Sequence, residues 1–257
     1  MPSSTWLLRA PAGRRARLRL FCFPYAGGGG SLYMSWAREL APTIEVCAVQ
    51  LPGRENRLRE PAYTRFAELT DATFHALRPY LDVPFALFGH SMGALVAFEL
   101  ARRLRAERAP APARLFVSGH RAPQLPNRRA PLAHLPDADL LAALRTRYDG
   151  VPEEVLRHAD LMALLLPCLR ADLALVESYA CREDDPLACS ISAYGGCDDP
   201  VVTEAELAAW RAQTLAGFTL ARLPGTHFFI RSARAELVAA VSRELASLTV
   251  TGALEVR

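Results

Sequence analysis

The stretch Phe85-Ala86-Leu87-Phe88-Gly89-His90-Ser91-Met92-Gly93 decides the fold. Four apolar residues lead into the pattern G-x-S-x-G, and a long helical pattern begins directly after the serine. This order predicts a strand, a sharp turn and a helix, with the serine exposed at the end of the strand. Glycine is expected at both flanking positions because a side chain there would collide with neighbouring backbone. The competing interpretation, a chance pentapeptide on a turn, does not account for the periodicity on both sides.

Short apolar runs alternate with helical patterns along most of the chain. The runs expected as strands are Leu18–Phe23, Ile44–Gln50, Phe85–Phe88, Leu115–Ser118, Ile191–Tyr194 and Phe218–Leu223. The patterns expected as helices are Ser31–Leu40, Arg65–Leu77, Met92–Glu107, Glu204–Thr214 and Arg234–Leu248. Nearly continuous apolar strands suit a sheet that is covered on both faces. The alternation therefore predicts an α/β fold in one domain, 1–257, with a mostly parallel central sheet flanked by helices.

The segment from about 132 to 187 breaks this alternation, because it contains no credible strand. Asp137–Tyr148, Glu153–His158 and Ala159–Ala180 have helical patterns, and Pro167 is expected to kink or split the last helix. Ligands of open α/β sheets bind at the carboxyl ends of the strands. An all-helical insertion that leaves from such an end is placed to act as a lid over a site. Extra packing of the core is the alternative role.

A serine becomes a good nucleophile only beside a general base. We expect Ser91 to be the nucleophile and His227 the base, because His227 lies in the loop between the last predicted strand and the last helix. From that loop an imidazole can reach a serine at the edge of the sheet. His134 and His158 also follow the serine, but they lie in the helical insertion.

The acid that orients the histidine should follow the preceding strand, where both Asp198 and Asp199 stand. We prefer Asp199, because the loop pattern G-x-x-D-P-x-V, counted from Gly196, puts the carboxylate just before Pro200. Asp198 is then a solvated or capping neighbour. The carboxylate would fix the tautomer of His227 and stabilise its charged form.

A tetrahedral intermediate needs two hydrogen-bond donors for its oxyanion. One is the backbone N–H of Met92, directly after the serine. We assign the other to the backbone N–H of Ala26, at the start of a loop in which Gly27–Gly30 allow amides to turn inward. A phosphate-binding loop is the competing interpretation, but this loop has neither the lysine nor the spacing of such a motif.

Composition excludes several other functions. The 257 residues include 30 lysines and arginines, and all 30 are arginine, so a lysine Schiff base and a lysine-containing phosphate loop are impossible. The net charge of +3 does not suggest a nucleic-acid binder. Six cysteines without a C-x-x-C pattern predict neither a disulfide framework nor a zinc site. The longest apolar run, Leu161–Leu169, is too short to span a membrane, and no signal segment is evident. We therefore expect a cytoplasmic protein without cofactor or metal.

Together these residues resemble the type II (editing) thioesterases of polyketide and nonribosomal peptide synthesis, which have the α/β-hydrolase fold. G-x-S-x-G alone is shared with lipases and esterases, whereas the other matching stretches are more specific. The resemblance rests on Phe23–Gly28, Gln50–Glu55, Gly89–Gly93, Ser118–Pro123, Leu169–Asp172, Glu177–Tyr179, Gly195–Pro200 and Gly225–Phe229. Tyr25 stands where the family often has histidine, which should not affect a backbone donor.

This resemblance implies that the substrate is an acyl thioester on the phosphopantetheine arm of an acyl or peptidyl carrier protein. The enzyme would remove stalled or misprimed acyl groups through an acyl-serine intermediate. The helical insertion would be the lid, and Leu161, Leu164, Leu165 and Leu169 could line an acyl chamber. Arginines near the entrance would meet the acidic carrier protein. The alternatives are a carboxylester hydrolase or medium-chain fatty acyl thioesterase with the same triad, a chain-terminating thioesterase, and a non-catalytic module that binds carrier proteins.

Overall fold

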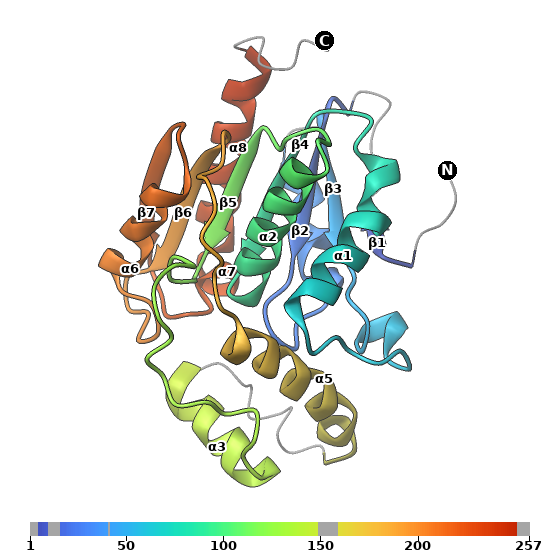
Figure 1. Cartoon of the computed structure of the whole chain (residues 1–257), viewed down its shortest axis with the longest axis vertical. Helices are drawn as coiled ribbons and strands as arrows, with labels where there is room; N and C mark the ends of the chain where they lie inside the picture. Colours follow the sequence, from blue (N-terminus) through green and yellow to red (C-terminus); the bar gives the residue numbers. More distant parts are fainter. Residues whose placement is uncertain (1–4, 10–15, 41, 149–158, 251–257) are drawn as a thin grey trace.

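A seven-stranded sheet forms the centre of the computed structural model, which describes residues 5–9, 16–40, 42–148 and 159–250 (Figure 1). The strand order is β1-β3-β2-β4-β5-β6-β7, with β1 antiparallel to β3 and the other pairs parallel. The strands are β1 (Leu7–Arg9), β2 (Leu18–Phe23), β3 (Ile44–Val49), β4 (Phe85–His90), β5 (Arg114–Ser118), β6 (Ser190–Gly196) and β7 (Phe218–Leu223). This arrangement confirms the predicted α/β fold with a mostly parallel sheet.

The central strands are apolar throughout because both faces of the sheet are covered. Every residue of β2, β3 and β4 is buried. Successive side chains of a strand point to opposite faces, so Phe21 and Leu87 join one hydrophobic cluster. Leu20 and Phe88 join the other. Burial of these side chains from water is the main force that holds the layers together.

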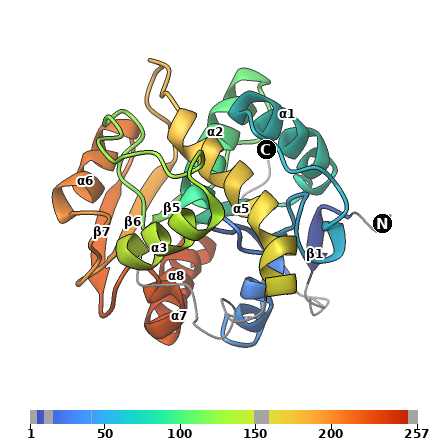
Figure 2. The same ribbon diagram turned by 90° about the horizontal axis from the view of Figure 1, so that it is seen from below.

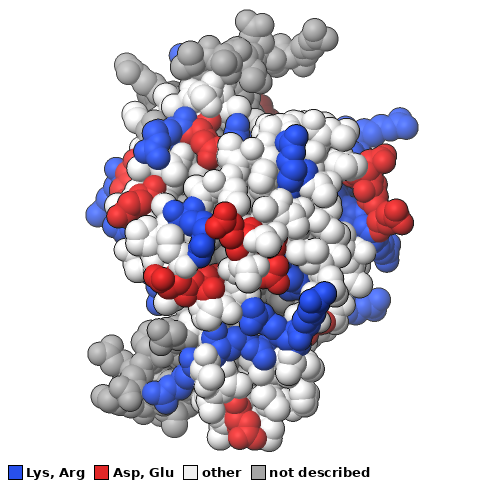
Figure 3. Space-filling model, turned by 90° about the vertical axis from the view of Figure 1, so that its left-hand side faces the viewer, with Lys and Arg blue, Asp and Glu red and all other residues white. Residues whose placement is uncertain are grey.

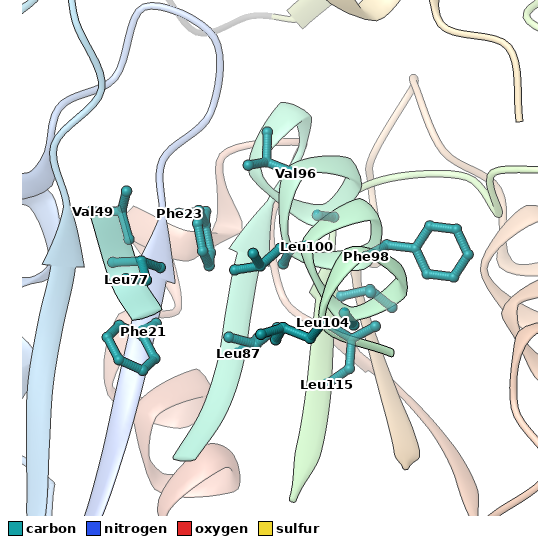
Figure 4. Close-up of a cluster of buried hydrophobic side chains, with 14 of the residues drawn as sticks. Phe21, Phe23, Val49, Leu77, Leu87, Val96, Phe98, Leu100, Leu104 and Leu115 are labelled. Carbon is teal, nitrogen blue, oxygen red and sulfur yellow. The ribbon is translucent and has the colours of Figure 1, made fainter. Parts of the chain in front are cut away.

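Helices cover the two faces of the sheet. α1 (Phe66–Leu77) and α2 (Met92–Ala106) pack on one face, where Leu100 and Leu104 of α2 meet Leu87 of β4 and Leu115 of β5 (Figure 4). The 3-10 helix η1 (Gly30–Arg38) and α8 (Arg234–Val250) pack on the other face. Shorter helices are η2 (Glu55–Arg57), η3 (Arg78–Tyr80) and α7 (Phe229–Ser232). No helix in the described ranges is long and apolar enough to cross a membrane.

Some predicted elements differ from the structure. The segment predicted as one helix over 204–214 consists of α6 (Glu204–Ala208) and the 3-10 helix η4 (Ala209–Gln213). The fully buried Trp210 holds η4 in place, since its indole N–H donates a hydrogen bond of 2.8 Å to the His120 carbonyl. The helix predicted over 31–40 is the 3-10 helix η1. The edge strand β1 was not predicted, because a three-residue strand carries almost no periodicity.

Two helices of the insertion lie together at one end of the sheet (Figures 1 and 2). They are α3 (Asp137–Tyr148) and α5 (Ala159–Ser178), and leucines of both share a separate hydrophobic cluster. α5 continues through Pro167, so the proline does not split the helix. The helix predicted over Glu153–His158 lies outside the described residues. Figure 2 shows α3 and α5 crossing in front of the strands.

Candidate active site

Ser91 lies in a strained turn between β4 and α2. Its backbone angles, φ 53° and ψ −117°, fall in a region that side-chain-bearing residues rarely adopt. A Cβ atom added to Gly89 would lie 2.0 Å from the Gly93 carbonyl oxygen, and one added to Gly93 would lie 2.2 Å from the Phe23 carbonyl oxygen. Both contacts are impossible, so the turn requires glycine on each side of the serine. The Ser91 N–H donates to the Ser118 carbonyl at 2.7 Å, which ties the turn to β5.

The structure brings Ser91, His227 and Asp199 into one hydrogen-bonded chain. The Nε2 atom of His227 lies 3.1 Å from the Ser91 Oγ atom, and its Nδ1 atom lies 2.9 Å from Asp199 Oδ2. The His227 side chain is 2% exposed and the Asp199 side chain 0%. These distances allow a histidine with a proton on Nδ1 to accept the serine proton through Nε2.

Of the two neighbouring aspartates, it is Asp199 that contacts the histidine. Its second oxygen, Oδ1, accepts backbone hydrogen bonds from Val201 at 2.7 Å and Val202 at 3.3 Å. The carboxylate is therefore fixed by three donors and can turn neither oxygen away. Asp198 is exposed, and its backbone N–H donates to the Gly225 carbonyl at 3.0 Å.

The two backbone amides assigned to the oxyanion lie beside the serine. Met92 is the first residue of α2, where the N–H has no intrahelical acceptor. Ala26 lines the same cavity as Ser91. The next two amides of its loop are already used, since Gly27 N–H donates to Asp172 Oδ2 at 2.7 Å and Gly28 N–H to the Tyr25 carbonyl at 2.8 Å. Among the hydrogen bonds of the described residues, none uses the N–H of Met92 or Ala26.

Two further buried histidines surround the site. His90 Nδ1 lies 2.9 Å from the Ser118 hydroxyl, and its ring centroid is 5.4 Å from that of His227. Burial holds the pKa of His90 well below its ordinary value. Burial lowers the pKa of His120 to about 3. Both rings are therefore neutral at pH 7 and place no positive charge beside His227.

An apolar cavity of about 200 Å³ opens beside Ser91 and His227. α5 supplies one wall, with Met162, Leu165, Leu169, Leu173 and Val176. The expectation for Leu164 was wrong: its side chain is 54% exposed and does not line the cavity. Adjacent helix positions point about 100° apart, so a wall that contains Leu165 excludes its neighbour. The side chain of Leu161 lies outside the described residues.

A smaller pocket of about 50 Å³, called the polar pocket here because charged side chains form part of its lining, also borders Ser91 and His227. Three arginines contribute to its lining, together with Asn127 and Glu177: Arg121, Arg129 and Arg147. Seen from the side of α6 and β7, arginines gather in a band between the helical insertion and the rest of the molecule (Figure 3). The same serine thus borders an apolar cavity and a smaller pocket that contains several charged side chains.

Tyr148 belongs to the site but was not identified from the sequence. It is the last residue of α3, lines both pockets, and has its ring centroid 5.1 Å from that of His227. No local pattern distinguishes it, because the contact joins a helix of the insertion to a loop of the core.

Comparison with known proteins places the chain among thioesterases. The family model described as "Thioesterase domain" matches residues 18–245. The gramicidin S biosynthesis protein GrsT of Aneurinibacillus migulanus is 42% identical over 240 residues, which cover 93% of each chain. Thioesterase PikA5 of Streptomyces venezuelae is 37% identical, with 99% of this chain and 90% of PikA5 covered. The structure of RedJ, a thioesterase from the prodiginine pathway of Streptomyces coelicolor, has a TM-score of 0.84 and 41% identity, covering 89% of this chain and 86% of RedJ.

Proposed function

The chain belongs to the thioesterase domain family and is a hydrolase of thioesters, and we propose that it removes acyl groups from carrier proteins of a polyketide or nonribosomal peptide synthase. The observation that carries this proposal is the hydrogen-bonded chain of Ser91, His227 and Asp199 beside an apolar cavity. The similarity to GrsT, PikA5 and RedJ supports the biosynthetic setting.

In the proposed reaction, Ser91 Oγ attacks the thioester carbonyl while His227 Nε2 takes the serine proton. The oxyanion of the tetrahedral intermediate accepts hydrogen bonds from the N–H groups of Met92 and Ala26. The intermediate collapses, the carbon–sulfur bond breaks, and His227 gives its proton to the departing pantetheine thiol. Water, deprotonated by His227, then hydrolyses the acyl-serine to a free acid. Asp199 holds the histidine in the required tautomer.

The two pockets beside Ser91 suit two parts of the substrate. The apolar cavity beside α5 would take the acyl chain, and the polar pocket lined by Arg121, Arg129 and Arg147, which is too small for the whole pantetheine arm, would receive its thiol end. The insertion over 132–187 would act as a lid within a single domain, because its helix α5 forms a wall of the cavity.

The expected partner is an acidic carrier protein, which the arginines that line the polar pocket, Arg121, Arg129 and Arg147, would attract. The substrate brings the phosphopantetheine group, and the proposed chemistry requires no other cofactor. Carrier proteins of this kind work in the cytoplasm, so we expect the enzyme there.

A comparison of kcat/KM between thioester and ester substrates tests the proposal. We expect the purified protein to hydrolyse acyl-carrier proteins and acyl-pantetheine thioesters with a higher kcat/KM than p-nitrophenyl esters of the same acids. Ser91→Ala should abolish both activities. A strong preference for the free esters would instead indicate a carboxylester hydrolase, and binding of carrier protein without turnover would indicate a non-catalytic module.

A further inference from the structure

A buried ion pair joins the helical insertion to the glycine-rich loop of the site. Arg54 binds Asp172 of α5 through two hydrogen bonds, NH1 to Oδ2 at 2.8 Å and NH2 to Oδ1 at 2.9 Å. The side chains are only 3% and 1% exposed. The two residues lie in stretches that the mechanism above does not use, the segments 50–55 and 169–172. A buried ion pair is costly unless its geometry is good and its remaining polar atoms are satisfied.

Both members of the pair also hold the backbone of the loop that contains Ala26. Asp172 Oδ2 accepts the Gly27 N–H at 2.7 Å, and Arg54 NH1 donates to the Gly28 carbonyl at 3.1 Å. The Arg54 Nε atom donates to the Pro52 carbonyl at 3.2 Å, which anchors the guanidinium to the segment after β3. The peptide plane that contains the Ala26 carbonyl and the Gly27 N–H is therefore fixed by a buried carboxylate. It directly follows the plane that carries the Ala26 N–H, whose Tyr25 carbonyl accepts the Gly28 N–H.

The hydrogen bonds of the loop remove two of its amides from the site. Gly27 N–H is bound to Asp172 and Gly28 N–H closes a turn on Tyr25, whereas none of the hydrogen bonds found among the described residues uses the Ala26 N–H, which can therefore meet an oxyanion. Catalysis by an oxyanion hole depends on donors that are held in position before the reaction begins. An error of about 1 Å in that position is enough to lower the rate about a hundredfold.

The same helix also builds the wall of the acyl cavity. Two leucines close to Asp172 line the cavity: Leu169, about one turn before it, and Leu173, directly after it. Leu169 packs directly against Gly27, since a Cβ atom added to that glycine would lie 3.2 Å from the Leu169 Cδ1 atom. The wall that would contact the acyl chain and the carboxylate that holds the loop thus belong to one helix, α5.

We propose that Arg54 and Asp172 are positioning residues that hold the Ala26 amide in place for the oxyanion and join it to the acyl-binding wall of α5. The pair touches no reacting atom and acts through the loop. The proposal rests on the thioesterase function and on the assignment of the Ala26 amide given above.

The test compares Asp172→Asn and Arg54→Lys with a matched control, Glu45→Gln. Glu45 is also a buried carboxylate, 5% exposed, and accepts a hydrogen bond from Arg19 at 2.8 Å, but it lies on β3 away from the loop. Each variant is assayed for kcat and KM on an acyl-pantetheine thioester and for melting temperature. A trifluoromethyl ketone of the same chain length, whose adduct with Ser91 carries an oxyanion, reports directly on the oxyanion hole.

We expect Asp172→Asn and Arg54→Lys each to lower kcat about 100-fold, which is the effect of losing one oxyanion donor. KM should change less than about 3-fold. Affinity for the trifluoromethyl ketone should fall in proportion to kcat. Glu45→Gln should lower the melting temperature but leave kcat and ketone affinity unchanged. The proposal is overturned if either folded variant keeps its kcat and ketone affinity, or if Glu45→Gln loses them equally. If the wild-type protein fails to hydrolyse the thioester at all, the proposed function fails instead.

Discussion

Replacing Asp199 by asparagine should reverse the tautomer of His227. Asp199 Oδ1 accepts backbone N–H groups from Val201 and Val202, so the carbonyl oxygen of an asparagine must stay at that position. Its NH2 group then takes the place of Asp199 Oδ2, which lies 2.9 Å from His227 Nδ1. An NH2 group can only donate to Nδ1, which moves the imidazole proton to Nε2 and points it at Ser91. The histidine can then no longer take the serine proton.

The size of the effect follows from the loss of the base. The same change in a serine protease lowers kcat by about 10⁴, which corresponds to about 5.5 kcal/mol of transition-state stabilisation. We expect a similar loss here, with KM nearly unchanged, measured by thiol release from an acyl-pantetheine substrate. Asp198→Asn is the matched control and should stay within about twofold of the wild-type rate, because Asp198 is exposed and forms its hydrogen bond through the backbone. A loss below about tenfold for Asp199→Asn, or an equal loss in the control, would refute the reasoning.

Three further predictions concern the turn, the cavity and a buried histidine. Gly93→Ala puts a methyl group 2.2 Å from the Phe23 carbonyl, so labelling of Ser91 by a fluorophosphonate should slow at least 100-fold; unchanged labelling would contradict the strained turn. Leu165→Trp should fill part of the apolar cavity and lower kcat/KM for decanoyl relative to butyryl thioesters about tenfold, and an unaltered chain-length profile would show that the acyl chain binds elsewhere. The pKa of His120 is about 3 in the folded protein and about 6.5 when unfolded, so the unfolded chain binds the extra proton between these values and stability falls as the pH drops. At pH 5 this costs about 2 kcal/mol, and urea unfolding of His120→Gln should show a correspondingly smaller difference between pH 5 and pH 8.

The sequence predicts the sheet well because its signals are local. The apolar run before Gly89 and the helical period after Ser91 each fix their own element, and the alternation of strands with helices predicts a mostly parallel sheet. β1 carries no such signal: its three residues form a strand only because β3 offers an edge, and Leu7 pairs with Val49 far along the chain. Contacts of this kind depend on tertiary packing and are invisible in a local pattern.

In the site, too, local sequence signals identify some residues and tertiary packing alone identifies others. Ser91 and His227 could be proposed from their places relative to a strand and a helix, whereas the choice between Asp198 and Asp199 depends on which side chain the loop turns inward. The bond between Arg54 and Asp172 joins residues separated by 118 positions. Both stretches are evident in the sequence, but only the three-dimensional fold brings the guanidinium to the carboxylate.

Rapid-quench mass spectrometry of the wild-type protein with an acyl-carrier protein tests the central claim most directly. The expected result is a peptide containing Ser91 that gains the mass of the acyl group and loses it again at the rate of turnover, with no such species in Ser91→Ala. Turnover without acylation of Ser91, or a transient acyl group on another residue, would contradict the account.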